Sequence, residues 1–308
     1  MKSISRNDQS LNWLGRWVDD GGKYSGWGGS ALQFNFTGTS LEIEVDVKNP
    51  GGIAVMIDDY SGDWTRRIEL KQDGVSVIKI VEGLEDKEHT AFLRFWSKNY
   101  KNKREGIDYV KVRSILIDDN ATVSKWSGKF KIGYFGDSWA SADNDFLRFL
   151  GLKDVEVHSI SDPGYSAKSG LKRYSYVVGE EPIKDIPFDT LVLGYGVNDA
   201  YGRLFFSHKW FFRRNIKKLV NKIRANNPSV KIILLQSPNN HDAEKDTSRY
   251  GEILKRISKK VNNSIYISSK EIENKLTWKP DGVHLDTNGK HIYGKWLGEK
   301  LGDYLRIN

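Results

Sequence analysis

The chain of 308 residues is longer than the ~250–300 at which a single hydrophobic core usually stops growing, so we expect two domains. It contains no cysteine, which excludes disulfides, thiolate catalysis and cysteine-bound zinc. The net charge of +8 is spread along the chain, with "FFRRNIKK" among its densest runs. We interpret it as solvated charge and expect no nucleic-acid partner, while attraction to an acidic polysaccharide remains open.

The sequence also carries information on membranes and export. No stretch approaches the ~18 consecutive apolar residues of a spanning helix, so we expect no membrane partner. The N-terminal stretch "MKSISRNDQSLNWLGRW" lacks the continuous apolar segment of a secretion signal. We therefore expect a cytoplasmic protein, export by a signal-free route, or a chain given in its mature form.

Hydrophobic and polar residues alternate in the first part of the chain, which is typical of half-buried strands. In "SLEIEVDV", Leu41, Ile43, Val45 and Val47 alternate with acidic residues. Similar segments are "SALQFNFTG", "GGIAVMIDD", "VSVIKIV", "TAFLRFW" and "DYVKVRSILID". Several strands without intervening helices predict an antiparallel sandwich of jelly-roll type over residues 1–124.

Apolar strands alternate with amphipathic helices over residues 125–308. Strands are predicted in "KIGYFGDS", "VEVHSI", "FDTLVLGYGVND", "VKIILLQSP" and "SIYISS". Helices are predicted in "NIKKLVNKIRANNP", "RYGEILKRISKKV" and "HIYGKWLGEKLGDYL". This order predicts an α/β domain with a parallel sheet covered by helices on both faces.

Polar residues follow four of these elements, and the carboxyl ends of parallel strands meet at one edge of a sheet. Ser138 and Gly164 follow the first two strands, Asn198 follows the third, and Asp281 with His284 precedes the last helix. A serine hydroxyl becomes a nucleophile when a histidine, oriented by a carboxylate, takes its proton. In "DGVH" the carboxylate can reach back to the imidazole within one turn. A helix beginning after Ser138 would direct its N–H groups at the same place.

These motifs together resemble the SGNH (GDSL-type) hydrolase superfamily. "GDS" at 136–138 is similar to its nucleophile block, and "PGYSAKS" at 163–169 resembles the block with the oxyanion glycine. "GVND" at 196–199 matches the Gly-x-Asn-Asp block, and "DGVH" at 281–284 matches the Asp-x-x-His block. The resemblance implies a three-layer, flavodoxin-like domain.

The same resemblance implies roles for the residues that match. Ser138 would be the nucleophile, His284 the general base and Asp281 the carboxylate that orients it. The amides of Ser138 and Gly164 and the side chain of Asn198 would form the oxyanion hole. The mechanism requires no cofactor, and the sequence shows no cluster of His, Asp or Glu with metal-ligand spacing.

A jelly roll containing "GGSALQFNFTGTSLEIEV" ahead of such a domain resembles the carbohydrate esterase family 2 arrangement. This implies a serine esterase that removes O-acetyl groups from an acetylated poly- or oligosaccharide. An SGNH-type O-acetyltransferase acting on a glycan is an alternative, as is a catalytically inactive carbohydrate-binding protein on the same scaffold. The oligomeric state does not follow from the sequence.

Other residues near the motifs have simpler interpretations beside the functional one. The aromatic residues that adjoin the four loops either contact substrate or pack in the core; they are Trp139, Tyr165, Tyr195 and Trp278. Asp137 and Asp199 are predicted to hold loops through backbone hydrogen bonds, and Asp286 to cap a helix or stabilise a turn. The remaining histidines considered are predicted to be structural or exposed; they are His158, His208, His241 and His291.

Overall fold

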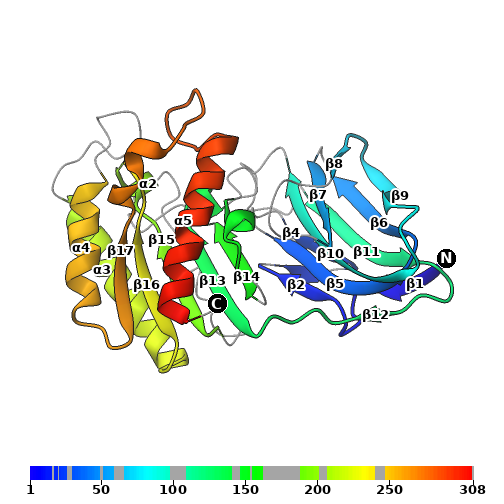
Figure 1. Cartoon of the computed structure of the whole chain (residues 1–308), viewed down its shortest axis with the longest axis horizontal. Coiled ribbons are helices and arrows are strands. Elements are labelled where there is room, and N and C mark those ends of the chain that lie inside the picture. Colours follow the sequence, from blue (N-terminus) through cyan, green and yellow to red (C-terminus); the bar gives the residue numbers. More distant parts are fainter. Residues whose placement is uncertain are drawn as a thin grey trace. The chain divides into compact units, whose positions relative to one another are not determined.

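The computed structural model describes residues 1–15, 17–19, 21–25, 30–48, 51–58, 66–97, 109–140, 146–152, 155–161, 188–200, 207–239 and 247–306. The chain divides into two compact units, Met1–Ser127 and Gly128–Asn308 (Figure 1). Each unit has its own hydrophobic core. Among the described helices, none has the length and the hydropathy that crossing a membrane requires.

The N-terminal unit consists of two six-stranded sheets whose described pairings are antiparallel. One sheet has the order β3 (Val18–Asp19), β4 (Lys23–Ser25), β11 (Tyr109–Ile117), β6 (Leu41–Lys48) and β9 (Gly74–Val81), and β1 (Lys2–Ser5) also pairs with β11. The other has the order β12 (Val123–Ser124), β5 (Ala31–Gly38), β10 (Lys87–Ser97), β7 (Gly51–Ile57) and β8 (Arg66–Leu70), and β2 (Asn12–Leu14) also pairs with β5. The predicted all-β sandwich is confirmed.

Alternation in the sequence becomes alternation in burial in the N-terminal unit. Along β6, Leu41, Ile43, Val45 and Val47 are buried, while the acidic residues between them are half-buried. Burying every second side chain of a strand on one face removes apolar surface from water while the other face stays solvated. The inward residues of β5, β7, β10 and β11 complete the same core.

Strand β9 departs from the predicted half-buried pattern. The strand forms where "VSVIKIV" predicts it, but Val75 and Val77 are 53% and 54% exposed. In the sheet order β9 is terminal and pairs with β6, and of its residues only Ile80 is buried in the core. Val75 and Val77 are paired with Asp46 and Glu44 on the outer side of β6, so they point away from the core. The period-2 pattern therefore located the strand correctly but did not show which of its faces is buried.

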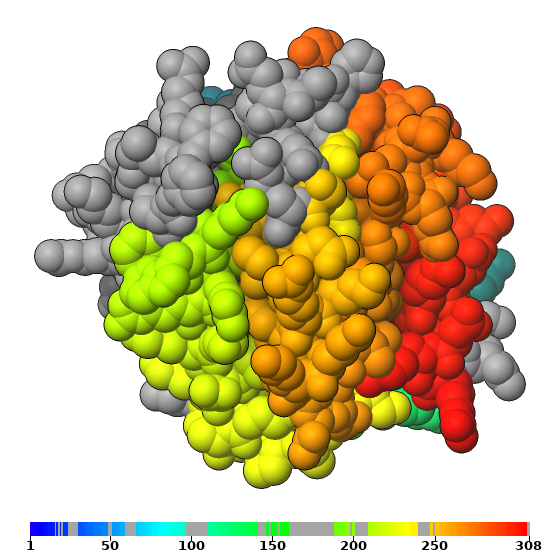
Figure 2. All heavy atoms as spheres, turned by 90° about the vertical axis from the view of Figure 1, so that its left-hand side faces the viewer, coloured from blue at the N-terminus to red at the C-terminus, as the bar shows by residue number. Residues whose placement is uncertain are grey.

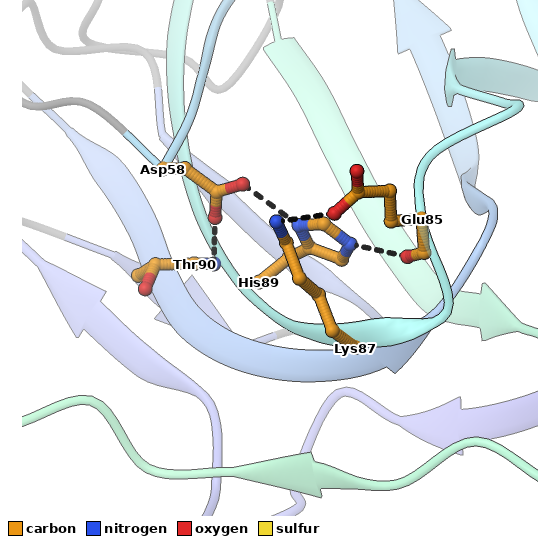
Figure 3. Close-up of polar contacts among 5 residues, drawn as sticks. All are labelled: Asp58, Glu85, Lys87, His89 and Thr90. Atoms are coloured by element: carbon orange, nitrogen blue, oxygen red, sulfur yellow. Dashed lines mark hydrogen bonds and ion pairs between the residues drawn. The ribbon is translucent and has the colours of Figure 1, made fainter.

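A buried histidine joins the end of β7 to β10 in the N-terminal unit (Figure 3). His89 is 3% exposed; its Nδ1 lies 2.7 Å from Oδ2 of Asp58, and its Nε2 lies 2.8 Å from the carbonyl oxygen of Glu85. The amide of Thr90 donates to Oδ1 of Asp58 at 2.8 Å. Lys87 forms an ion pair with the Glu85 carboxylate at the surface, at 2.6 Å. Asp58 therefore holds both the ring and the backbone of β10.

The C-terminal unit is built on a five-stranded parallel sheet. Its order is β14 (Val155–Ser161), β13 (Phe130–Gly136), β15 (Thr190–Gly194), β16 (Lys231–Gln236) and β17 (Ser264–Ser268). In chain order this is 2-1-3-4-5, the flavodoxin-like arrangement that the sequence predicts. The described helical segments are η2 (Ser138–Ala140), η4 (Leu147–Phe149), α2 (Val197–Ala200), α3 (Ser207–Asn226), α4 (Ser248–Ser258), η5 (Ser269–Glu271), η6 (Glu273–Lys275) and α5 (Thr287–Leu305).

Helices cover both faces of this sheet, giving three layers (Figure 1). Alternate strand residues point to opposite faces: Val192 packs with α5, whereas Leu191 and Leu193 pack with α3 and α4. Helix α3 begins earlier than predicted and includes "SHKWFFRR". Phe212 explains the extension, because it lies one helical turn before Ile216 and is buried on the same face.

Glycines let α5 approach the neighbouring segment closely. A Cβ at Gly294 would overlap the carbonyl oxygen of Phe146, and one at Gly298 would overlap that of Leu150. The glycines that lower the intrinsic helix propensity of this segment are thus required by backbone-to-backbone packing. The packing of α5 on the sheet fixes the position of the loop that precedes it.

Candidate active site

Ser138 lies directly beyond the end of a buried strand. β13 runs through Phe130–Gly136, and Ser138 begins the short 3-10 helix η2. The helix predicted after Ser138 is thus a three-residue turn within the described residues, and 141–145 lie outside them. β13 and β15 are the strands between which the order of the sheet reverses, the position where α/β proteins bind their ligands.

Asp137 links the ends of these two strands. It is fully buried, its Oδ1 accepts a hydrogen bond from the amide of Trp139 at 3.2 Å, and its Oδ2 accepts one from the amide of Val197 at 3.1 Å. The predicted loop-holding role of Asp137 is therefore confirmed. The carboxylate fixes the backbone on both sides of Ser138 relative to α2.

Asp281 and His284 are brought together by a tight turn before α5. The amide of Lys279 donates to the carbonyl of His284 at 2.7 Å, and the amide of Gly282 donates to the carbonyl of Lys279 at 2.9 Å. Gly282 has φ of +63°, in the left-handed region that favours glycine. Asp286 caps α5 by accepting from the amide of Gly289 at 2.8 Å, as predicted. The turn is thus closed at one end by its own hydrogen bonds and at the other by the helix cap.

The three side chains form a continuous chain of hydrogen bonds, although Ser138 and His284 are 146 positions apart. Oγ of Ser138 lies 2.8 Å from Nε2 of His284, and Nδ1 of His284 lies 2.7 Å from Oδ2 of Asp281. The side chains of His284 and Asp281 are 28% and 46% exposed, so solvent reaches this group. In this arrangement a carboxylate can orient the ring, and the ring can accept the hydroxyl proton.

Asp281 is held as a carboxylate. Partial burial raises the pKa of Asp281, but hydrogen bonds from the amide and ring of His284 and from the amide of Val283 outweigh it and lower the pKa to about 2. Its Oδ1 accepts both amides, at 2.9 Å each, so Oδ2 is left for the imidazole. The backbone of the turn thus orients the carboxylate that orients the ring.

The residues predicted for the oxyanion hole are only partly described. Gly164 lies outside the described residues, as does Tyr165. Asn198 lies in α2, and its side chain is outside the described set. The strand predicted through "GVND" ends instead at Gly194, because Gly196 has φ of +133° and the chain then forms one helical turn. The oxyanion roles of Ser138, Gly164 and Asn198 remain predictions.

Two of the aromatic residues predicted as possible substrate contacts belong to the core. Trp139 and Tyr195 are each 1% exposed. The ring of Trp139 packs edge-on against Phe146 and Tyr293, and a ring this deeply buried cannot stack on a sugar. The structure therefore corrects the substrate-contact interpretation of both residues. Trp278 is partly exposed and lies 6.0 Å from the Trp139 ring, so its interpretation as a substrate contact remains open.

Tyr134 supports the site and is not singled out by the sequence. Its ring lies against Gly136, where a Cβ would come to 3.0 Å from it, and a Cβ at Gly194 would overlap its hydroxyl. Gly136 and Gly194 are directly paired on β13 and β15. The sequence feature that could have indicated Tyr134 is the glycine at the end of each of these two strands, because a glycine leaves room for a large neighbouring side chain.

Other predicted residues are structural where the structure describes them. Tyr250 donates its hydroxyl proton to the backbone carbonyl of Asp199 at 2.9 Å. His158 is buried, with Nε2 at 2.5 Å from Oε1 of Glu156, and His291 stacks on Phe149 from α5. His241 and the side chain of His208 lie outside the described residues. Over the described ranges, no three His, Asp or Glu side chains gather as a metal site would require.

Comparisons with known proteins agree with this architecture. The family model for the carbohydrate esterase 2 N-terminal domain matches residues 13–103, within the N-terminal unit. A family two carbohydrate esterase from Clostridium thermocellum, solved in complex with cellohexaose, has a TM-score of 0.70 at 15% identity, covering 97% of this chain and 100% of its own. The chain has the fold of the family 2 carbohydrate esterases.

Two further solved structures share the fold of the family 2 carbohydrate esterases. An acetyl xylan esterase from the rumen bacterium Butyrivibrio proteoclasticus has a TM-score of 0.69 at 13% identity and covers both chains completely. A salicylyl-acyltransferase from a tetracycline biosynthetic pathway has a TM-score of 0.69 at 20% identity, again with both chains covered completely. No curated protein matches this sequence. The resemblance predicted from the sequence is confirmed.

Proposed function

We propose that this protein is a serine esterase that removes O-acetyl groups from a carbohydrate. The observation that carries the proposal is the hydrogen-bonded series Ser138–His284–Asp281 at the carboxyl edge of the parallel sheet. Each member has the partner that acyl transfer requires: the hydroxyl faces an imidazole nitrogen, and the opposite nitrogen faces a carboxylate.

In the first half of the reaction, Oγ of Ser138 attacks the carbonyl carbon of the acetyl ester while Nε2 of His284 takes its proton. The tetrahedral intermediate then collapses, the bond to the sugar oxygen breaks, and His284 returns the proton to that oxygen. The amides of Ser138 and Gly164 and the side chain of Asn198 are proposed to stabilise the oxyanion. The products of this half are the free sugar hydroxyl and an acetyl-serine.

In the second half, water attacks the acetyl-serine and His284 takes a proton from it. Collapse of this intermediate releases acetate and returns the proton to Ser138. Asp281 stays ionised throughout, because its pKa of about 2 lies far below neutral pH. Its negative charge stabilises the imidazolium that forms twice in each cycle.

The carbohydrate part of the proposal has separate support. Residues 13–103 match the carbohydrate esterase 2 N-terminal family, and structures sharing the fold are named as a family two carbohydrate esterase and an acetyl xylan esterase. The fold and the triad support ester cleavage, and the family match supports a glycan as the molecule that bears the ester. An acetylated glycan is therefore the proposed substrate.

The decisive experiment is Ser138→Ala, with Ser258→Ala on the distant helix α4 as the matched control. Hydrolysis of p-nitrophenyl acetate and release of acetate from acetylated xylan are measured for both. We expect kcat to fall ~10⁴-fold or more in the first variant, as for other serine nucleophiles, and to stay at the wild-type value in the second. Unchanged hydrolysis by Ser138→Ala would overturn the assignment.

A second candidate is acyl transfer to a sugar hydroxyl by the same residues. The full-length structural match to a salicylyl-acyltransferase favours it, since that protein shares the fold. The two candidates differ only in whether water or another hydroxyl attacks the acyl-serine. We measure free acetate and acetylated product after adding an oligosaccharide acceptor. Acetate alone supports the esterase, whereas product that grows at the expense of acetate supports the transferase.

A further inference from the structure

Helix α3 has a strongly one-sided distribution of charge. Between Ser207 and Asn226, seven side chains are Lys or Arg and none is Asp or Glu. Five of its apolar residues are buried in the core beside the sheet: Phe212, Ile216, Leu219, Val220 and Ile223. Arg224 donates to main-chain carbonyls near the end of the helix, including that of Asn263 at 3.0 Å. The other six basic side chains are exposed.

Two exposed aromatic side chains lie near the start of helix α3, among its exposed basic residues. Trp210 is 56% exposed and Phe211 is 36% exposed, and their rings meet edge-on with centroids 5.0 Å apart. The guanidinium carbon of Arg214 lies 5.1 Å from the centre of the Trp210 ring, a cation–π contact one helical turn further along. Lys217 follows on the same side. The exposed ring of Trp210 is thus followed along the helix by the cations Arg214 and Lys217.

Exposed cations are also present on the adjacent helix, in its last turn and just beyond it, beside the end of α3 that lies away from Trp210, where Arg224 donates to the carbonyl of Asn263. Figure 2 shows α3 and α4 side by side on one face of the C-terminal unit. We define the α3/α4 basic face by its exposed cations, which are Lys209, Arg213, Arg214 and Lys217 from α3, and Lys255, Arg256, Lys259 and Lys260 from α4 and the residues that follow it. Within the described part of the chain, no carboxylate forms an ion pair with any of these eight side chains.

The topology brings one end of this face toward the active site. β15 and β16 are parallel neighbours, so the connection between them runs from the carboxyl edge of the sheet back to the opposite edge. Helix α3 is part of that connection, and its first turns, with Trp210, are therefore at the edge where Ser138 lies. A chain-like ligand entering the active site could extend along α3.

We propose that the α3/α4 basic face binds an acidic polysaccharide, so that the natural substrate is an acetylated glycan bearing carboxylates. This inference rests on the proposed function. Arginine presents a planar fork that matches a carboxylate, lysine supplies point charges, and a flat indole can stack on the face of a sugar ring. A polymer alternating rings and carboxylates would meet both kinds of group along α3.

Two other anionic partners fit the same face less well. An amphipathic helix that binds a membrane inserts its apolar face into the lipid, whereas the apolar face of α3 is already covered by the sheet. Single-stranded nucleic acid would stack successive bases on several aromatic side chains, and among the described exposed residues of this face only Trp210 and Phe211 are aromatic. The exposed cations, together with the ring of Trp210 as a surface for stacking on a sugar, favour an acidic glycan over a membrane or a nucleic acid.

The first test measures binding without catalysis, using polygalacturonate that carries no acetyl group. Affinity electrophoresis compares the wild type, Trp210→Ala, the double variant Arg214→Glu/Lys217→Glu, and the control Lys270→Glu/Lys295→Glu. The control reverses the same number of exposed cations away from α3 and α4. We expect retardation of the wild type and the control, and loss of retardation in the α3 variants.

The second test concerns turnover. Release of acetate is compared on O-acetylated polygalacturonate and on the same polymer after its carboxyl groups are reduced, with each rate divided by that enzyme's own rate on p-nitrophenyl acetate. We expect the wild type to favour the acidic polymer by about tenfold at low salt, within the range of electrostatic steering. The preference should vanish in Arg214→Glu/Lys217→Glu and near 1 M salt, where the Debye length is about 3 Å.

The outcomes separate this inference from the proposed function. Absence of p-nitrophenyl acetate hydrolysis would overturn the proposed esterase function. The binding test would still show whether the α3/α4 basic face binds an acidic polysaccharide. Hydrolysis with equal rates on the two polymers, or equal retardation of the α3 and control variants, overturns the acidic-glycan inference alone. Binding to phosphatidylserine vesicles or to a single-stranded oligonucleotide that depends on Trp210 and exceeds binding to polygalacturonate also overturns it.

Discussion

Each of the two units contains a histidine paired with an aspartate. The contact between Nδ1 of the ring and the carboxylate is nearly identical in the two pairs. In both, Nδ1 of the ring lies 2.7 Å from a carboxylate oxygen: His89 with Asp58 in the N-terminal unit, and His284 with Asp281 in the C-terminal unit. The difference lies at the other ring nitrogen. Nε2 of His89 faces the carbonyl of Glu85, whereas Nε2 of His284 faces the hydroxyl of Ser138.

That second partner determines what each ring can do. A carbonyl and an ionised carboxylate only accept hydrogen bonds, so both nitrogens of His89 face acceptors, and this arrangement favours the protonated ring. A hydroxyl can donate or accept, so the neutral ring of His284 can receive the serine proton. A carboxylate–histidine pair is therefore evidence of a general base only when the far nitrogen faces a group that can give up a proton.

The burial of the two rings agrees with this distinction. His89 is 3% exposed, while the side chain of His284 is 28% exposed beside a loop open to solvent. Burial alone would lower the pKa of His89, but hydrogen bonds to the Glu85 carbonyl and the Asp58 carboxylate outweigh it and raise the pKa. The folded protein thus favours the protonated form of His89, which suits a structural role.

The largest difference between the two rings is expected when the same substitution is made at each. We expect His284→Gln to lower kcat/KM for p-nitrophenyl acetate by about 10⁴-fold or more while its unfolding curve stays near the wild type, because the general base is removed from a surface loop. His89→Gln serves as the matched control and should keep the activity of the folded protein. Comparable losses of activity in the two variants would mean that the pairs do not differ as proposed.

The next largest effect is expected for Asp281→Asn. An amide in place of the carboxylate can leave the ring in the wrong tautomer and removes the charge that stabilises the imidazolium, so kcat should fall by about 10⁴-fold, as in other triads. Because the pKa of Asp281 is about 2, the wild-type carboxylate does not protonate above about pH 3. Wild-type kcat measured from pH 4 to 9 should therefore show no change that comes from protonation of Asp281. A kcat within tenfold of the wild type would remove Asp281 from the mechanism.

The buried pair predicts a dependence of stability on pH in the N-terminal unit. The pKa of His89 is raised in the folded protein, so its contribution is complete below its ordinary value of 6.5 and is lost as the pH rises through the raised value. His89→Gln should therefore cost about 1–3 kcal/mol at pH 6, because a buried acceptor loses its donor, and less at pH 9.

The measurement is hydrogen exchange of peptides from β10, expressed as protection factors at each pH. These report the local stability of the strand that carries His89, separately from the C-terminal unit. A difference between wild type and His89→Gln that stays constant from pH 6 to 9 would contradict the raised pKa of His89. A peptide from β16 provides the internal control.

The two histidine–aspartate pairs also differ in whether their contact can be predicted from the sequence. Asp281 and His284 are three positions apart within one turn, so their contact at 2.7 Å follows from local spacing. His89 and Asp58 are 31 positions apart and meet only because β7 and β10 are neighbours, so the sequence did not indicate their contact. Strand order is set by long-range packing, which a local pattern does not contain.

The same limit explains two of the other departures from prediction. The alternation in "VSVIKIV" predicts a strand, but whether Val75 and Val77 are covered depends on which face of β9 meets the core, and the structure pairs them with the outward residues Asp46 and Glu44. Trp139 adjoins Ser138 in sequence, yet its side chain points into the core. Adjacency along the chain places a backbone near a site and leaves the direction of the side chain to packing.

The smallest expected effect concerns a second aspartate in the loop of His284. Asp286 accepts hydrogen bonds from the amide of Gly289 and, at 2.5 Å, from the hydroxyl of Thr277, but among the described residues no histidine ring contacts it as His284 contacts Asp281. Asp286→Ala should cost about 1 kcal/mol of unfolding free energy through loss of the helix cap, while Asp286→Asn, which retains a capping oxygen, should cost less. Denaturant unfolding and p-nitrophenyl acetate hydrolysis are measured on both variants, and activity should stay near the wild type. A fall in kcat comparable to that of Asp281→Asn would show that the cap at α5, rather than the carboxylate on the ring, controls the position of His284.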